Sequence, residues 1–170
     1  MTDIQVRQAT ESDASGFLGL WDALDTETEF MFFEPNERNE TLESQKSKLA
    51  RSTDSNHVRV LVLDVLGENV LAGFCAGRRS SAFRDQHSLH VFIGIRELYT
   101  GKGWGERLLI ELEDWAKSKD VIRLELSVMV TNKRAIKLYK NMGFKVEGTK
   151  KNAVLLHSGY VDEYIMAKLI

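Results

Sequence analysis

The stretch "LELSVMVTNKRAIKLYKNMGF", residues 124–144, carries the signals that decide the fold of this chain. Its first residues alternate apolar and polar side chains, which is typical of a strand with two different faces. Asn132 then stands at a preferred helix N-cap, and Gly143 follows the helical residues as glycine does just beyond a helix end. The sequence therefore predicts a strand over residues 121–130 and a helix over residues 132–142.

A glycine-rich stretch, "YTGKGWGERLL" at residues 99–109, comes one strand and one helix earlier. Glycines allow the backbone to approach a ligand, and a helix N-terminus beyond them offers free N–H groups and the positive end of the helix dipole. Lys102 and Arg107 add positive charge, so a diphosphate fits this loop. The alternative is a tight strand-to-helix turn without a ligand.

The spacing of these glycines excludes two familiar phosphate motifs. No Gly-Lys-Ser/Thr follows them, so the loop is not a P-loop. The order G-x-G-x-G differs from the G-x-G-x-x-G of the dinucleotide fingerprint. The glycines alone leave the ligand undefined.

The remaining patterns predict an α/β fold with a mixed sheet and a central βαβ unit. Predicted strands lie at residues 4–7, at 58–77 as a hairpin about Gly67, and at 87–95. Predicted helices follow the cap residues 10–13 up to about residue 25, occupy 41–51, and follow the glycines. Two further strands, with "HSGY" as the turn between them, complete the chain.

Composition restricts the class of protein. The chain has 170 residues with 43% hydrophobic and 28% charged side chains, which predicts one globular domain over residues 1–170. A net charge of -2 gives no pull toward nucleic acid or an anionic membrane. Cys75 is the single cysteine, so an internal disulfide is excluded, and we expect an inert buried thiol and a cytoplasmic protein. The N-terminal residues lack a signal-peptide pattern, and the histidines lack metal-ligand spacing.

The two motifs together resemble those of the GCN5-related N-acetyltransferase (GNAT) superfamily. Its members show Gln/Arg-x-x-Gly-x-Gly/Ala before a helix, and then Asn-x-x-Ala-x-x-x-Tyr-x-x-x-Gly-Phe. Here these are residues 100–105 and 132–144. The first strand and cap, "RQATESDA", and the C-terminal residues 147–170 are also similar, the latter to the ribosomal-protein and phosphinothricin acetyltransferase-like branches. The resemblance implies a mixed, mostly antiparallel sheet of about seven strands with about four helices.

The resemblance also implies that the ligand is acetyl-CoA, used without a metal. The loop amides would hold the pyrophosphate, and the backbone of residues 93–95 would hold the pantetheine arm in a slot where two strands separate. Thr100 departs from the family pattern, which weakens a side-chain contact to the diphosphate. The implied acetyl-CoA-binding residues are Ile93, Ile95, Thr100, Gly101, Lys102, Gly103, Trp104, Gly105, Asn132 and Tyr139.

Two helix residues have both a structural and a functional interpretation. Asn132 is either the helix N-cap alone or also a hydrogen-bond partner of coenzyme A. Tyr139 is either a core tyrosine or, as the resemblance implies, the acid that protonates the departing thiolate. The complete motif favours the functional role of Tyr139.

The proton acceptor is less well defined, since an attacking amine must lose a proton. Glu125 is our choice, because it shares a strand face with Arg123 and Ser127 near the expected slot. His90, Glu29, Glu34 and a water chain are alternatives.

The acceptor pocket is predicted in the irregular segment 27–40. Glu29, Phe30, Phe33 and His90 are the candidate substrate-binding residues, with core packing as the alternative for the aromatic ones.

The sequence supports two functions. The first is an acetyl-CoA-dependent N-acetyltransferase that moves the acetyl group directly to a primary amine. A small-molecule amine is slightly favoured over a protein N-terminus, and the resemblance implies that homodimers are frequent. The second is a module that binds coenzyme A without catalysis, as a sensor or regulator.

Overall fold

The structure, a computed structural model, describes residues 3–170, so the first two residues of the predicted domain lie outside it. A single seven-stranded sheet with strand order β1-β2-β3-β4-β5-β7-β6 forms the centre of the fold. The strands are β1 (Ile4–Gln8), β2 (Val58–Val65), β3 (Val70–Arg79), β4 (Ser88–Ile95), β5 (Arg123–Met129), β6 (Lys145–Leu156) and β7 (Gly159–Leu169). The α-helices are α1 (Ala14–Glu27), α2 (Leu42–Thr53), α3 (Trp104–Lys117) and α4 (Lys133–Asn141), with 3-10 turns at Glu11–Asp13 and Glu97–Tyr99. The predicted element order and the mixed sheet are confirmed.

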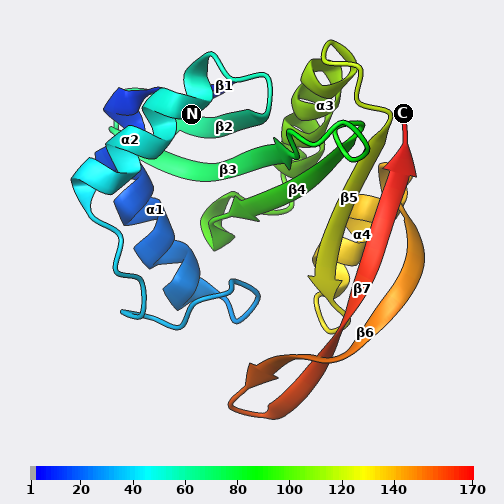
Figure 1. The fold of residues 1–170 in the computed structure, drawn as a ribbon. Helices are drawn as coiled ribbons and strands as arrows, with labels where there is room; N and C mark the ends of the chain where they lie inside the picture. The colour runs from blue at the N-terminus through cyan, green and yellow to red at the C-terminus, as the bar shows by residue number, and fades with distance from the viewer. Residues whose placement is uncertain (1–2) are drawn as a thin grey trace.

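The helices cover the two faces of the sheet unequally (Figure 1). On one face, α1 and α2 pack over the first three strands, and their buried side chains meet Val62, Leu71 and Phe74. On the other face, α3 and α4 pack over the centre of the sheet, where Leu108, Leu112 and Tyr139 join the larger core. None of the helices in residues 3–170 covers the front of β5 and β7, the face that carries Arg123, Glu125 and Ser127. The described helices therefore leave this face of the sheet open.

The start of α1 is fixed by a buried polar cluster. The Thr10 amide donates to Asp13 Oδ2 at 2.7 Å, and the Arg7 guanidinium donates to both Asp13 oxygens at 2.7 and 2.8 Å. Burial opposes ionisation of Asp13, but these hydrogen bonds outweigh it and lower the pKa of the carboxyl. The "RQATESDA" segment thus joins β1 to the helix, as the resemblance implied.

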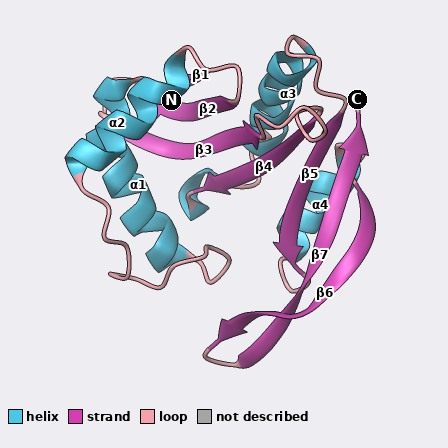
Figure 2. Cartoon of the chain, in the orientation of Figure 1, coloured by secondary structure: helices cyan, strands magenta, loops and turns pink. Residues whose placement is uncertain are grey.

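Strands β4 and β5 form the only parallel pair among the described residues. They pair only through Ser88↔Arg123, Leu89↔Leu124 and His90↔Glu125. Beyond His90, β4 continues to Ile95 and β5 to Met129 without pairing to each other, so the two strands separate (Figure 2). This parallel pair is the central βαβ unit, because α3 connects its two strands.

Candidate active site

The glycine loop and the start of α3 form one rim of the opening between β4 and β5. Gly101 has φ 72° and Gly103 has φ 82°, both in the left-handed region that favours glycine. A Cβ atom at either position would meet no atom within 4 Å, so the space in front of the loop is open. The Arg107 amide bonds the Gly103 carbonyl at 3.2 Å, and the amides of the preceding helical turn are left free at the positive end of α3. The loop therefore fits an anion.

Gly105 has a different structural role from Gly101 and Gly103. It is buried within α3, and a Cβ atom there would lie 2.7 Å from Leu138 Cδ2 on α4. Glycine therefore leaves room for the Leu138 side chain of α4 beside the first turn of α3.

Three cations surround the loop, and one of them is not in the loop sequence. Lys102 Nζ donates to the Leu98 carbonyl at 2.9 Å, and the Arg107 guanidinium lies 5.0 Å from the Trp104 ring centroid. Arg134, from the first turn of α4, donates to Thr100 Oγ1 at 2.8 Å. A guanidinium thus stands beside the position where Thr100 replaces the usual Gln or Arg. Sequence reasoning missed Arg134 because it occupies a variable position of the Asn-x-x-Ala motif.

The backbone of β4 presents free groups to the opening. The Arg96 amide bonds the Ala72 carbonyl of β3 at 2.9 Å, whereas the His87 carbonyl accepts from the Ile122 amide at 3.0 Å on the β5 side. The β3–β4 register has no shift between these points, and backbone groups alternate between the two edges of a strand. Ile93 and Ile95 lie an even number of residues from His87, so their backbone N–H and C=O groups point to the same edge of β4 as those of His87. This edge faces β5 across the gap.

Helix α4 positions the two motif residues. Asn132 Oδ1 accepts from the Ala135 amide at 3.2 Å, so the N-cap interpretation is confirmed. Tyr139 is buried, and its ring lies 5.8 Å from that of Phe144. Burial raises the pKa of Tyr139, and nearby Cys75 raises it further. Cys75 pairs with Ile93 across β3 and β4, so the phenol beside Cys75 lies near the gap. Because its pKa is raised, the phenol stays protonated at neutral pH.

The raised pKa values of Cys75 and Tyr139 predict that the protein becomes less stable at alkaline pH. Burial raises the pKa of both groups above their ordinary values of 9.0 for the thiol and 10.0 for the phenol. A raised folded-state pKa contributes stability below the unfolded value, and this stability is lost as pH rises toward the folded value. We expect the free energy of unfolding to fall by about 1.4 kcal/mol per pH unit above pH 9 for Cys75 alone. Urea unfolding from pH 7 to 10.5 measures this slope. A Cys75→Ala variant should show a shallower slope, and an identical slope would contradict the assignment.

Glu125 lies where β4 and β5 stop pairing. His90 Nδ1 is 3.9 Å from Glu125 Oε1, and Arg123 Nε donates to Glu125 Oε2 at 3.1 Å. The Arg123 guanidinium also bonds both oxygens of Glu147. The structure therefore brings together the two proton acceptors proposed for β4 and β5, at the closed end of the gap.

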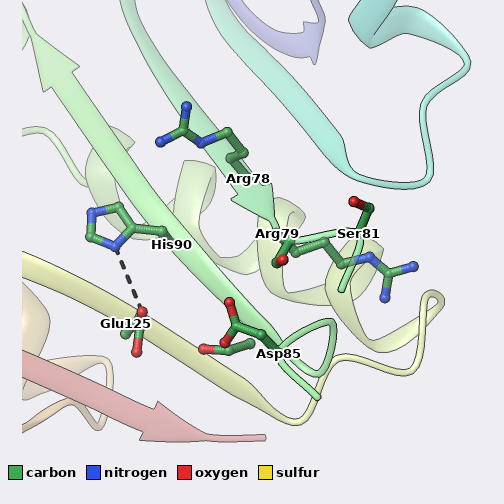
Figure 3. Close-up of a pocket in the computed structure, with 8 residues that line it drawn as sticks. Arg78, Arg79, Ser81, Asp85, His90 and Glu125 are labelled. Atoms are coloured by element: carbon green, nitrogen blue, oxygen red, sulfur yellow. Dashed lines mark ion pairs between the residues drawn. The ribbon is translucent and has the colours of Figure 1, made fainter. Parts of the chain in front are cut away.

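A cavity of about 480 Å³ opens over this pair on the front of the sheet (Figure 3). Its lining residues come from the ends of β3, the following loop, and the starts of β4 and β5: Arg78, Arg79, Ser80, Ser81, Asp85, Ser88, His90 and Glu125. Sequence reasoning identified only His90 and Glu125 among them. The others depend on strand register and on the course of the β3–β4 loop, which the sequence pattern does not specify.

The predicted acceptor segment lies outside this lining. Phe30 and Phe33 are each 37% exposed, so neither is a core side chain, and Glu29 is exposed. The segment is held by Arg38, which bonds Asp25 and lies 4.5 Å from the Phe33 ring centroid. Glu34 approaches His157 of the β6–β7 turn at 3.9 Å. The segment and this hairpin therefore border the same open face from below.

Two further features of residues 3–170 bear on the class of protein. They contain no group of three or more His, Cys, Asp or Glu side chains placed to hold a metal ion. None of the helices described has the length and apolarity needed to cross a membrane.

Comparisons with known proteins agree with this geometry. The model of the "Acetyltransferase (GNAT) family" matches residues 20–144. L-amino acid N-acetyltransferase AaaT of Escherichia coli (strain K12) is 45% identical over 90 residues, which cover 51% of this chain and 54% of that protein. The chain spans about half the length of the curated relatives it matches.

Solved structures share the whole fold. An acetyltransferase of the GNAT family from Streptococcus pneumoniae has a TM-score of 0.93 at 27% identity, covering 99% of this chain and 100% of that one. A phosphinothricin acetyltransferase from Sinorhizobium meliloti, in complex with AcCoA, has a TM-score of 0.83 at 17% identity, covering 100% and 89%. These matches identify an acetyltransferase fold. The chain belongs to the GNAT family, as the two sequence motifs predicted.

Proposed function

We propose that this protein is an acetyl-CoA-dependent N-acetyltransferase that transfers the acetyl group directly to a primary amine. The observation that carries the proposal is the separation of β4 and β5 beside an open glycine loop, with a buried Tyr139 on one side of the gap and Glu125 at its end. Bound acetyl-CoA supplies the thioester that the amine attacks.

The binding residues are arranged along the gap from one end to the other. The free amides at the start of α3, with Lys102 and Arg134, would hold the pyrophosphate, supported by the N-terminus of α4 at Asn132. The free backbone groups of Ile93 and Ile95 would bond the pantetheine arm as a strand partner does. Thr100 positions Arg134, while Trp104 forms the first helical residue beside the loop.

The chain provides a group for each proton transfer. Glu125 accepts the proton that the attacking nitrogen loses. Tyr139 donates a proton to the sulfur as the carbon–sulfur bond breaks and the carbon–nitrogen bond forms. The buried phenol carries its proton at neutral pH, so it is available as a donor. A backbone N–H of β4 in the gap can stabilise the negative charge on the carbonyl oxygen.

A small-molecule amine is the favoured acceptor. AaaT, the amino-acid acetyltransferase to which part of this chain is similar, supports this choice. Glu29, Phe30 and Phe33 would then border the entrance, and His90 would contact the acceptor. A protein N-terminus is the alternative substrate, and a non-catalytic sensor that binds acyl-CoA is the alternative function. The buried, unreactive thiol of Cys75 fits a cytoplasmic location.

Release of coenzyme A thiol in the presence of a panel of amines tests the proposal. Cys75 is fully buried and should not react with the thiol reagent, so the native chain can be assayed directly. Turnover with at least one amine is expected. Acetyl-CoA binding in calorimetry without turnover on any amine would favour the sensor, and absence of binding would exclude both functions.

Arg134 is expected to contribute to acetyl-CoA affinity. An Arg134→Gln variant should weaken binding about 10-fold, because it loses a charge-assisted contact at the loop. Calorimetric titration with acetyl-CoA measures the effect, and the difference from the native protein should narrow at high salt. Lys140→Gln, an exposed residue at the other end of α4, is the matched control. Equal affinities of the two variants would remove Arg134 from the site.

A further inference from the structure

Three side chains form a row across the front of the sheet, one from each of β3, β4 and β5. Arg78 is paired with His90, and His90 with Glu125. Directly paired residues project from the same face of a sheet, so a cation, an imidazole and a carboxylate lie side by side. Figure 3 shows His90 between the other two. The strand positions of Arg78 and Glu125 are therefore two strand spacings apart, about 10 Å.

Arg78 is the cation of this cavity whose guanidinium has no hydrogen-bond partner among the described residues, and its contact is with an aromatic ring. Within residues 3–170 it makes no ion pair, and its guanidinium lies 5.9 Å from the Phe92 ring centroid. Arg79, in contrast, is held by the carbonyls of Asn56, Gln86 and Lys119. The exposed planar fork of Arg78 is therefore free to bind a carboxylate through two parallel hydrogen bonds.

A second, independent group in the cavity also lacks a partner. Ser88 lines the cavity and is only 8% exposed, and its Oγ atom has no hydrogen-bond partner in the part of the chain that the structure describes. A buried hydroxyl without a partner is unfavourable, so native proteins nearly always satisfy it. Ser88 precedes His90 by one strand repeat and points to the same face, which places its hydroxyl beside the row. A ligand acceptor atom at this position would satisfy it.

The row also lies at the reactive end of the gap. His90↔Glu125 is the last pair before β4 and β5 separate, and Ile93 begins the free edge only three residues later. A molecule bound over the row would have one end at Arg78 and the other at Glu125, next to the opening. This step rests on the proposed function, which places the thioester in that opening.

We propose that the cavity binds a free α-amino acid as the acetyl acceptor, with its α-carboxylate on Arg78 and its α-amine toward Glu125 and His90. An α-amino acid carries one positive and one negative group a single carbon apart, and the long Arg78 side chain spans the remaining distance. A polyamine has no carboxylate for Arg78, and a protein N-terminus replaces the carboxylate by a peptide carbonyl. Asp85, on the same cavity wall, disfavours acceptors with an acidic side chain, because like charges repel.

The test compares free acids with their amides. The standard L-amino acids are assayed for coenzyme A release, and each active one is compared with its α-carboxamide, with spermidine and with a short peptide. The native protein should prefer the free acid. In Arg78→Gln, kcat/KM for the free acid should fall about 100-fold, mainly through KM, while the value for the carboxamide should stay within about threefold. Arg78→Lys should recover part of the loss, since it keeps the charge without the fork.

Arg84→Gln is the matched control, because it removes an exposed arginine of the neighbouring loop that does not line the cavity. Equal losses for the acid and the carboxamide in Arg78→Gln, or native preference for spermidine or the peptide, would overturn the amino-acid site while leaving the acetyltransferase intact. If no amine is turned over, calorimetry with the amino acids in the presence of coenzyme A decides the site separately. Binding that depends on Arg78 would then support it, and no binding would overturn it.

Discussion

Replacement of Tyr139 by phenylalanine is expected to lower kcat at least about 100-fold, the usual contribution of a positioned general acid. The hydroxyl is the only atom removed, so the ring remains packed against Phe144. Its pKa is raised by burial and by Cys75, so the native phenol carries a proton over the working pH range. The thiolate must otherwise leave without a proton donor. Steady-state assays at saturating acetyl-CoA and amine measure the loss directly.

The controls for this variant separate catalysis from binding and folding. Calorimetric affinity for acetyl-CoA should stay within about threefold, because the proposed contacts to the pyrophosphate and the pantetheine arm do not use the hydroxyl. Tyr160→Phe removes the hydroxyl of an exposed tyrosine of the β6–β7 hairpin, 67% exposed, and should leave kcat unchanged. A Tyr139→Phe enzyme with native kcat would remove the acid assignment and leave the acetyl-CoA site standing.

The order of the elements could be predicted because each one is specified locally. Asn132 and Gly143 define α4, the turn residues after Val65 define the β2–β3 hairpin, and the cap residues near Asp13 define the start of α1. Element ends were less accurate. Helix α1 continues to Glu27, beyond the expected residue 25, where the Thr28 amide still bonds the Leu24 carbonyl.

The acceptor side of the site, apart from His90 and Glu125, could not be predicted, because it depends on the register between neighbouring strands. Arg78 meets His90 only through the β3–β4 register, and a slip by one residue would turn it to the opposite face. Arg134 was missed for a related reason, since it meets Thr100, 34 residues away in sequence, only in the folded protein. The motif residues were found because each of the two motifs is a continuous segment of the sequence.

Substitution of Gly103 by valine is expected to weaken acetyl-CoA binding about 100-fold or more. Gly103 is the N-cap of α3 with φ 82°, a conformation that a β-branched residue avoids strongly. The loop would have to change its backbone angles, and the free amides at the start of α3 would no longer point together at one anion. Each charge-assisted hydrogen bond lost costs about 1.5–3 kcal/mol, so losing two accounts for the expected factor.

Gly67→Val is the control that isolates the ligand contribution. Gly67, in the β2–β3 turn, also has φ 82°, and a Cβ atom there would likewise meet nothing within 4 Å. The backbone strain is therefore matched, and both variants should lose about 1–2 kcal/mol of unfolding free energy in urea titrations. Only Gly103→Val should lose affinity in calorimetry with acetyl-CoA, because only its backbone belongs to the proposed anion site. If the two variants bound acetyl-CoA equally well, the glycine loop would be a turn without a ligand, which is the alternative that the glycines alone left open.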